Sequence, residues 1–293
     1  MSEVGFGIQG SGQLVDGVPD PGRFREVAVR AEELGYDSIW AGDHISYRNP
    51  ILDVVVALST FAAVTSRITV GAGVVLLPLR HPSVVAKEFA SLDYLSGGRT
   101  ILGVGVGGES GPDFDAVGVS PRERGARTDE AMVALRALFR DSPAAHRGRF
   151  FSFEGISIEP RAARPGGPPL WVGGRSPAAI RRAAALGDGW IPIFISPERF
   201  ALGRRELPSH VVPAVTVPAH AGSKRDLYEH LKARYSGYFG EHVVDRYCVA
   251  GTPEECVARV REYLDAGARH VVFNALELED VERLREVARA AAG

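Results

Sequence analysis

An adjacent aspartate and histidine, Asp43 and His44, form the first pair in this chain whose side chains could move a proton. They follow the apolar run Ser38–Trp40, which predicts a short buried strand. An imidazole changes protonation near neutral pH, and a carboxylate can hold a ligand or a partner group. The pair therefore indicates proton transfer at a strand end. The structural alternative is an aspartate that caps a turn beside a solvent-exposed histidine.

Glycines interrupt the next apolar run, Ile68–Leu76, at Gly71 and Gly73. Glycine inside a buried strand costs roughly 0.5–1 kcal/mol relative to alanine. A β-bulge or the close approach of a ligand commonly accounts for such glycines, and a barrel-corner kink without a ligand is the alternative.

A third glycine-rich segment ends the following apolar run. Gly103, Gly105 and Gly108 match the spacing G-x-G-x-x-G of dinucleotide-binding turns. We reject that interpretation because residues 109–119 read as a loop, whereas a dinucleotide turn leads directly into a helix. The segment instead predicts a glycine-lined strand end that offers backbone N–H groups to an anion, with Glu109 directed into the cleft.

A fourth segment, Gly173-Gly174-Arg175-Ser176-Pro177, predicts a helix N-terminus, with serine as the N-cap and proline in the first turn. Glycines, an arginine and a helix N-terminus together favour anion binding. An ordinary capped helix is the alternative.

Strand and helix signals alternate along nearly the whole chain. The expected strands are Val4–Gln9, Ser38–Trp40, Ile68–Leu76, Thr100–Val106, Leu170–Val172, Trp190–Phe194, Val211–Val217 and His270–Asn274. The expected helices are Gly22–Leu34, Leu52–Val64, Pro82–Leu95, Pro121–Phe139, Pro177–Leu186 and Val281–Ala291. Eight strand–helix units in order predict a (β/α)8 TIM barrel, since an open doubly wound sheet normally stops at five or six strands.

Two segments depart from this alternation. Before strand five, residues 141–169 contain a candidate hairpin at Phe150–Ile158. After strand seven, we expect residues 222–252 to form a second, helical insertion. No linker rich in Gly, Ser or Pro divides the chain, so we expect one domain over residues 1–293.

Composition narrows the classes of function. The chain has 293 residues, of which 45% are hydrophobic, and a formal net charge of −2 without a basic stripe, which argues against nucleic-acid binding. The histidines show no metal-ligand spacing, and Cys248 and Cys256 form no CxxC motif, so we expect no metal and a reducing compartment. The N-terminus lacks signal-peptide features and no apolar run reaches ~20 residues, which predicts a cytoplasmic protein without membrane contact.

Six stretches carry a family resemblance: AEELGYDSIWAGDH (31–44), TSRITVGAGVVLLPLRHPSVVAKEFASLDYLSGGR (65–99), LGVGVGGE (102–109), ERGARTDEA (123–131), PPLWVGGRSPAAIRRAAALGDGWIP (168–192) and GTPEECVARVREYLDAG (251–267). Together they resemble the bacterial luciferase-like family of flavin- and deazaflavin-dependent oxidoreductases, over nearly the whole chain. The pattern is most similar to the branch that uses coenzyme F420, an 8-hydroxy-5-deazaflavin.

The resemblance implies roles for the residues that match. Asp43 and His44 would lie beside the deazaflavin ring and the substrate, with Asp43 holding the ring and His44 exchanging the substrate proton. Gly73 and Val74 would form a non-prolyl cis peptide that supports the ring from behind.

Two further matches concern the rest of the cofactor. The family's Gly-Thr-Gly-Glu stretch corresponds to Gly107, Gly108 and Glu109, with Val106 or Gly107 in place of its threonine, and Glu109 is a second candidate proton donor. The four residues that match the phosphate and side-arm site are Gly173, Gly174, Arg175 and Ser176. Ser46, Tyr47 and Arg48 replace the aromatic residue of the sugar-phosphate branch, so a sugar phosphate is not implied.

The resemblance thus implies an oxidoreductase that transfers a hydride between F420 and a small organic substrate. An FMN-dependent luciferase-like monooxygenase is the alternative, because both cofactors carry a side-arm phosphate. A non-catalytic flavin-binding barrel is the second alternative. The resemblance also implies a homodimer.

Overall fold

The computed structural model describes residues 4–10, 14–15, 18–108, 111–235 and 239–293. Within these residues, eight parallel strands close into a barrel, because each strand pairs with the next and the last pairs with the first. In barrel order they are β1 (Gly5–Gln9), β4 (Ser38–Ala41), β5 (Thr69–Ala72), β7 (Thr100–Gly105), β10 (Leu170–Gly173), β11 (Gly189–Ile191), β12 (Val212–His220) and β14 (His270–Ala275). The predicted TIM barrel is confirmed.

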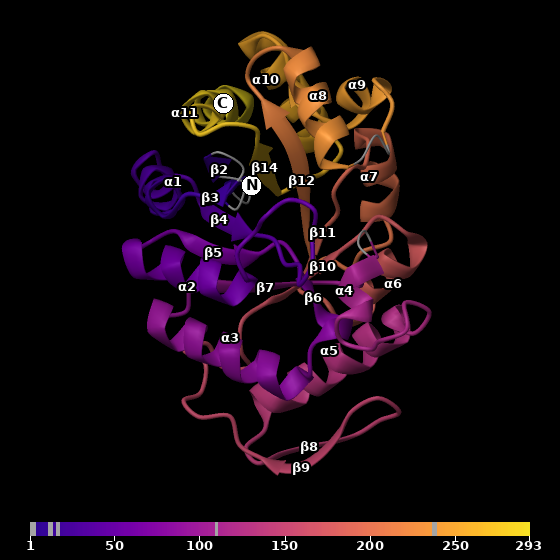
Figure 1. The fold of residues 1–293 in the computed structure, drawn as a ribbon. Helices are drawn as coiled ribbons and strands as arrows, with labels where there is room; N and C mark the ends of the chain where they lie inside the picture. Colours follow the sequence, from indigo (N-terminus) through magenta and orange to yellow (C-terminus); the bar gives the residue numbers. More distant parts are fainter. Residues whose placement is uncertain (1–3, 11–13, 16–17, 109–110, 236–238) are drawn as a thin grey trace.

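Helices cover the outside of the barrel (Figure 1). They are α1 (Pro21–Glu33), α2 (Val54–Val64), α3 (Pro82–Ser96), α5 (Arg124–Arg140), α6 (Pro177–Leu186), α7 (Pro197–Arg204), α10 (Pro253–Asp265) and α11 (Asp280–Ala292). The helix α5 begins three residues later than predicted, because residues 121–123 form a turn. The helix α7 was not predicted, although its start carries the Ser196 N-cap and first-turn Pro197 that mark other helices here.

The two insertions lie where the sequence placed them. Before β10, β8 (Ala144–Arg147) and β9 (Ser152–Ile156) form an antiparallel hairpin outside the ring of helices (Figure 1). The predicted hairpin span was wrong in its first half, because the turn falls at residues 148–151, where the carboxylate of Glu130 accepts three backbone N–H groups. After β12 the chain forms α8 (Lys224–Arg234), α9 (His242–Tyr247) and β13 (Val249–Ala250), which pairs with β12.

Short elements between the main ones include β2 (Leu14–Val15) with β3 (Val18–Pro19), β6 (Val75–Leu76), a 3-10 turn at Leu77–Leu79, and α4 (Gly111–Asp115). The helix α4 lies in the segment 109–119 that was predicted to be a loop. No helix in the described parts of the chain combines the length and apolarity needed to cross a membrane.

Large aromatic side chains fill the barrel interior, where the indoles of Trp40 and Trp171 lie 5.4 Å apart between ring centroids. Gly71 makes room for the first of them, because a Cβ atom there would lie 2.4 Å from the Trp40 ring. Of the two strand glycines, Gly71 is therefore a packing residue and not a point of ligand approach.

Candidate active site

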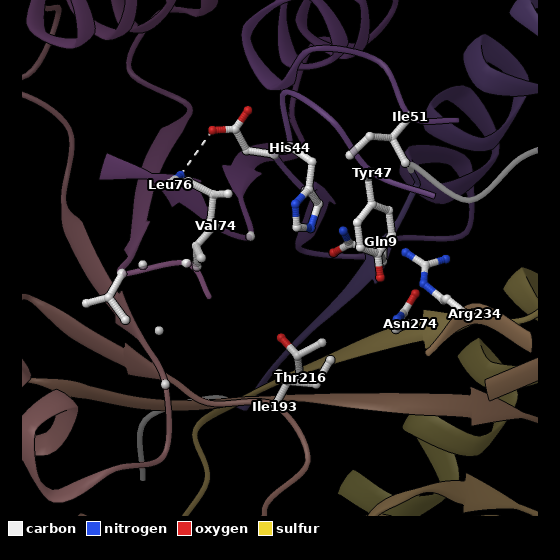
Figure 2. A pocket seen from close by; sticks show the side chains of 18 of the residues that line it. Gln9, His44, Tyr47, Ile51, Val74, Leu76, Ile193, Thr216, Arg234 and Asn274 are labelled. Atoms are coloured by element: carbon white, nitrogen blue, oxygen red, sulfur yellow. Dashed lines mark hydrogen bonds between the residues drawn. The ribbon is translucent and has the colours of Figure 1, made fainter. Parts of the chain in front are cut away.

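A cavity of about 230 Å³ opens at the C-terminal ends of the barrel strands, where TIM barrels carry their active sites (Figure 2). The strand ends and following loops contribute Gln9, Gly42, Asp43, His44, Tyr47, Ile51, Gly73, Val74, Leu76, Gly105, Val106, Gly107, Gly173, Gly174, Ile193, Thr216 and Asn274, and the end of α8 contributes Arg234 and Tyr235. Eight of the twelve residues that the sequence proposed for the site lie in this lining.

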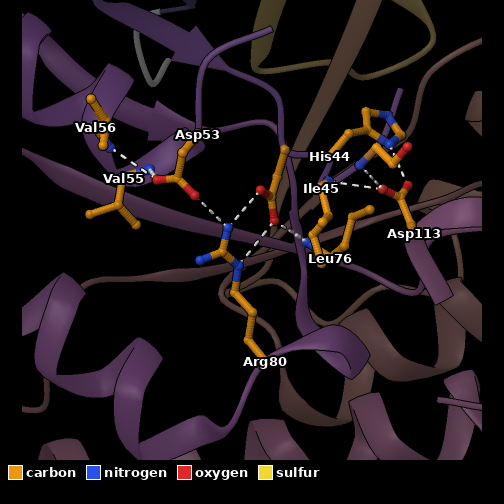
Figure 3. Close-up of polar contacts among 10 residues, drawn as sticks. His44, Ile45, Asp53, Val55, Val56, Leu76, Arg80 and Asp113 are labelled. Carbon is orange, nitrogen blue, oxygen red and sulfur yellow. Dashed lines mark hydrogen bonds and ion pairs between the residues drawn. The ribbon is translucent and has the colours of Figure 1, made fainter. Parts of the chain in front are cut away.

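The imidazole of His44 is held by a carboxylate that sequence reasoning missed. Its Nδ1 lies 2.7 Å from Oδ2 of Asp113, a side chain that is 1% exposed (Figure 3). The other oxygen, Oδ1, accepts the backbone N–H groups of Ile45 and Ser46, each at 2.8 Å. A carboxylate with these donors is satisfied as an anion, so His44 donates its Nδ1 proton to Asp113 and Nε2 is left as the acceptor.

The ring of Tyr47 stacks on the imidazole ring of His44, with the two centroids 4.0 Å apart and an interplanar angle of 11°. The imidazole is thus oriented by a hydrogen bond at its edge and by a ring against its face. The only sequence signal for Asp113 was an acidic residue in the segment that follows the glycine-rich strand end.

Asp43 is a buried residue of the cavity lining, and its carboxylate is bound by groups of the protein itself. It accepts the backbone N–H of Leu76 at 3.0 Å and pairs with the guanidinium of Arg80 at 2.8 Å, which also binds Asp53 at 2.8 Å (Figure 3). Burial opposes the charge of Arg80, but the two carboxylates outweigh this effect and raise the pKa of the guanidinium. The carboxylate of Asp43 therefore fixes β6 against the end of β4.

The peptide bond between Gly73 and Val74 is cis, as predicted from the resemblance. The isopropyl group of Val74 fits against the backbone of two neighbouring strands, because they carry glycine there. A Cβ atom at Gly105 would lie 2.4 Å from Val74 Cγ2, and one at Gly173 would lie 3.0 Å from Cγ1. At Gly103 the nearest atom would be the carbonyl oxygen of Ala72, at 1.9 Å, so that glycine chiefly admits the backbone of β5. Gly105 and Gly173 thus create the space for Val74, a role that the sequence pattern alone did not indicate.

The glycine-lined end of β7 presents its backbone to the cavity, with Val106 and Gly107 in the lining. Gly107 and Gly108 have φ angles of +67° and +118°, which other residues rarely adopt. The guanidinium of Arg124 lies against Gly108, since a Cβ atom there would be 2.8 Å from its Nη1. Among the described residues that guanidinium has no hydrogen bond or ion pair. Glu109 lies outside the described residues.

At the end of β10, Gly173 and Gly174 line the cavity, whereas the next two side chains are turned to other partners. The hydroxyl of Ser176 accepts a backbone N–H of α6 at 3.2 Å, which confirms the predicted N-cap. Arg175 donates from Nη1 to the carbonyl oxygens of Phe194 at 2.7 Å and Ile193 at 3.3 Å. Its guanidinium therefore ties the loop after β10 to the loop after β11.

Comparison with known proteins identifies the family of this chain. The family model described as luciferase-like monooxygenase matches residues 4–209. The chain belongs to this family. It is 30% identical to an F420-dependent glucose-6-phosphate dehydrogenase of Kineococcus radiotolerans, over 87% of each protein.

Two further likenesses show the range of this family. The chain is 34% identical to a 4-hydroxyprotoasukamycin monooxygenase of Streptomyces nodosus subsp. asukaensis, over 61% of this chain and 50% of the relative. The structure of an F420-dependent secondary alcohol dehydrogenase in complex with an F420-acetone adduct superposes with a TM-score of 0.83, at 20% identity and 99% coverage of both chains. The family resemblance predicted from the motifs is confirmed.

Proposed function

We propose that this family member is an oxidoreductase that binds coenzyme F420 at the barrel mouth and transfers a hydride between the deazaflavin and a small organic substrate. One juxtaposition carries the proposal: the apolar side chain of Val74 and the oriented imidazole of His44 line the same cavity. The names of its relatives support the choice of cofactor. When bound, F420 supplies the carbon that accepts or donates the hydride.

The chemistry of the cavity fits such a cofactor. Val74 offers an apolar contact for a flat ring, and Gly105 and Gly173 let its isopropyl group pack down against the backbone of the neighbouring strands. The backbone of Gly107 and Gly108, with the guanidinium of Arg124 against it, suits an anionic side arm. This assignment moves the cationic part of the predicted phosphate site from Arg175 to Arg124, because Nη1 of Arg175 already donates to two backbone carbonyl oxygens.

In this proposal His44 holds the substrate proton. Its Nδ1 proton is committed to Asp113, so Nε2 is the atom that takes a proton when a substrate hydroxyl is oxidised and returns it in the reverse reaction. Tyr47 keeps the ring plane in place through its stacking contact. Glu109 remains the second candidate from the sequence.

Asp43 acts as a positioning residue in this proposal. Its carboxylate binds the backbone N–H of Leu76, two residues beyond Val74, and is neutralised by Arg80. We infer that it supports the cofactor ring through the Val74 segment, and that direct contact with the ring is secondary.

The test is a parallel binding titration with purified F420 and FMN. We expect F420 to bind at micromolar concentration or better and FMN clearly more weakly. Gly105→Ala should weaken F420 binding, because the new methyl group would lie 2.4 Å from Val74. Gly111→Ala is the matched control, since no atom of the described residues, apart from its chain neighbours, lies within 4 Å of the added Cβ. Retention of FMN without F420 binding would overturn the proposal.

An FMN-dependent monooxygenase is the second candidate, supported by the family model and by the monooxygenase relative. The same titration separates the two cofactors. Screening oxidation of the reduced cofactor against enones, imines and nitro compounds tests the third candidate, a non-catalytic flavin-binding barrel, which predicts binding without turnover. A single domain, a homodimer and a cytoplasmic location remain predictions from the sequence and the resemblance.

A further inference from the structure

One cation in the cavity has no role in the site described above. Arg234, the last residue of α8, lines the cavity, as do Asn274 and Thr216 (Figure 2). Its Nε is buried and has no hydrogen-bond partner among the described residues. A buried donor without an acceptor is uncommon in folded proteins and indicates an unfilled binding position.

A second donor lies on the same side of the cavity. Asn274 follows Phe273, which pairs with Ile8 of β1 and Val217 of β12. The backbone position of Asn274 is therefore fixed by the strand pairing of the barrel. In the described part of the chain this amide makes no hydrogen bond. Both Arg234 and Asn274 line the cavity, and Figure 2 draws their side chains near each other in its view.

The charge of Arg234 is not compensated by the described lining residues. The acidic side chain there, Asp43, is already paired with Arg80. His230, one turn earlier on α8, adds no second positive charge near neutral pH, because its burial, and then the nearby charge of Arg234, lower its pKa to about 4. The cavity therefore holds a positive charge that an anionic ligand would neutralise.

We propose that Arg234 and Asn274 bind a carboxylate of the substrate, so that this enzyme acts on small organic acids. A guanidinium fork and an amide match the two oxygens of a carboxylate. A single cation balances the single charge of a carboxylate, whereas a phosphate carries nearly two charges. This inference rests on the proposed function, since the carboxylate would hold the substrate in the cavity that His44 also lines.

The experiment measures binding of pyruvate, 2-oxopentanoate and 4-oxopentanoate and of their primary amides, by calorimetry, to the F420-loaded protein and to the protein without cofactor. We expect at least one acid to bind ~10–100-fold more tightly than its amide, the range for a hydrogen-bonded charged group. Arg234→Met should remove this preference and leave the dissociation constant of F420 unchanged. Arg225→Met, an exposed arginine on the same helix, is the matched control.

Three results would overturn the inference: equal binding of every acid and its amide, no binding of any acid, or a loss of F420 affinity in Arg234→Met that assigns this residue to the cofactor. The comparison of acid with amide uses the natural protein, so it holds even if a variant fails to fold. Failure of F420 to bind, with the acid preference intact, would instead refute the proposed function and keep the carboxylate subsite.

Discussion

Replacing Asp113 with asparagine tests the proton-transfer role of His44 with almost no change in side-chain size. In the natural protein, Oδ1 accepts the N–H groups of Ile45 and Ser46, and Oδ2 accepts the Nδ1 proton of His44. The asparagine oxygen must stay with the two backbone donors. Its NH2 group then faces Nδ1, which has to become an acceptor, and the imidazole proton moves to Nε2.

The reversed tautomer removes the lone pair from the atom that faces the cavity. A positioned acid or base is typically worth 10²–10⁴-fold, so kcat should fall by about that factor, or about 3–5 kcal/mol in activation free energy. Loss of the negative charge also weakens three hydrogen bonds, which should lower the free energy of unfolding by about 1–3 kcal/mol.

The assay is steady-state reduction of F420 by the hydroxyl form of a substrate found by screening, the direction in which Nε2 must accept a proton, together with F420 binding. We expect kcat to fall while the dissociation constant of F420 stays nearly unchanged. His44→Gln should lower kcat by a similar factor, and the double variant should lose little more, because the two residues act as one unit. Asp115→Asn, an exposed position on the same short helix, is the control. A natural kcat and pH profile in Asp113→Asn would show that the proton moves elsewhere.

Three further predictions concern the cofactor and the fold. Arg124→Ala should weaken F420 binding more than Arg175→Ala does, most clearly at low salt, and the opposite order would return the phosphate to the loop after β10. Asp43→Asn should weaken F420 binding by loosening the Val74 segment, and crystallography of the variant should show that segment displaced. Burial opposes ionisation of Glu32, but the backbone N–H groups of residues 66–68 outweigh it and lower its pKa to about 2. A carboxyl group whose pKa is lowered by folding stabilises the fold at pH values above its ordinary pKa, and this stabilisation is lost as the pH falls towards 2. Acid unfolding should therefore show a loss of at most about 3 kcal/mol in the free energy of unfolding, and Glu32→Gln should abolish this pH dependence.

Much of the fold was predictable because the barrel repeats one local pattern. A strand such as Thr100–Gly105 is buried along its whole length, so its apolar run is visible in the sequence without any knowledge of its neighbours. Helix starts were also visible, since Ser176 and Pro177 form the cap and first turn locally. The hairpin was misplaced because Glu130, on a different element, determines where its turn falls.

The sequence alone indicated the segments that line the cavity: the Asp43–His44 pair, the Gly73–Val74 peptide and the glycine-rich ends of two strands. Tertiary structure decided what each residue contacts. Asp113 reaches His44 across 69 positions in the chain, and Arg80 draws Asp43 away from a purely ligand-facing role. Glycines of β7 and β10 make room for Val74 only because these two strands pair with each other beside its segment. Local patterns record burial and backbone shape, whereas partners so distant in the chain depend on how the whole barrel closes.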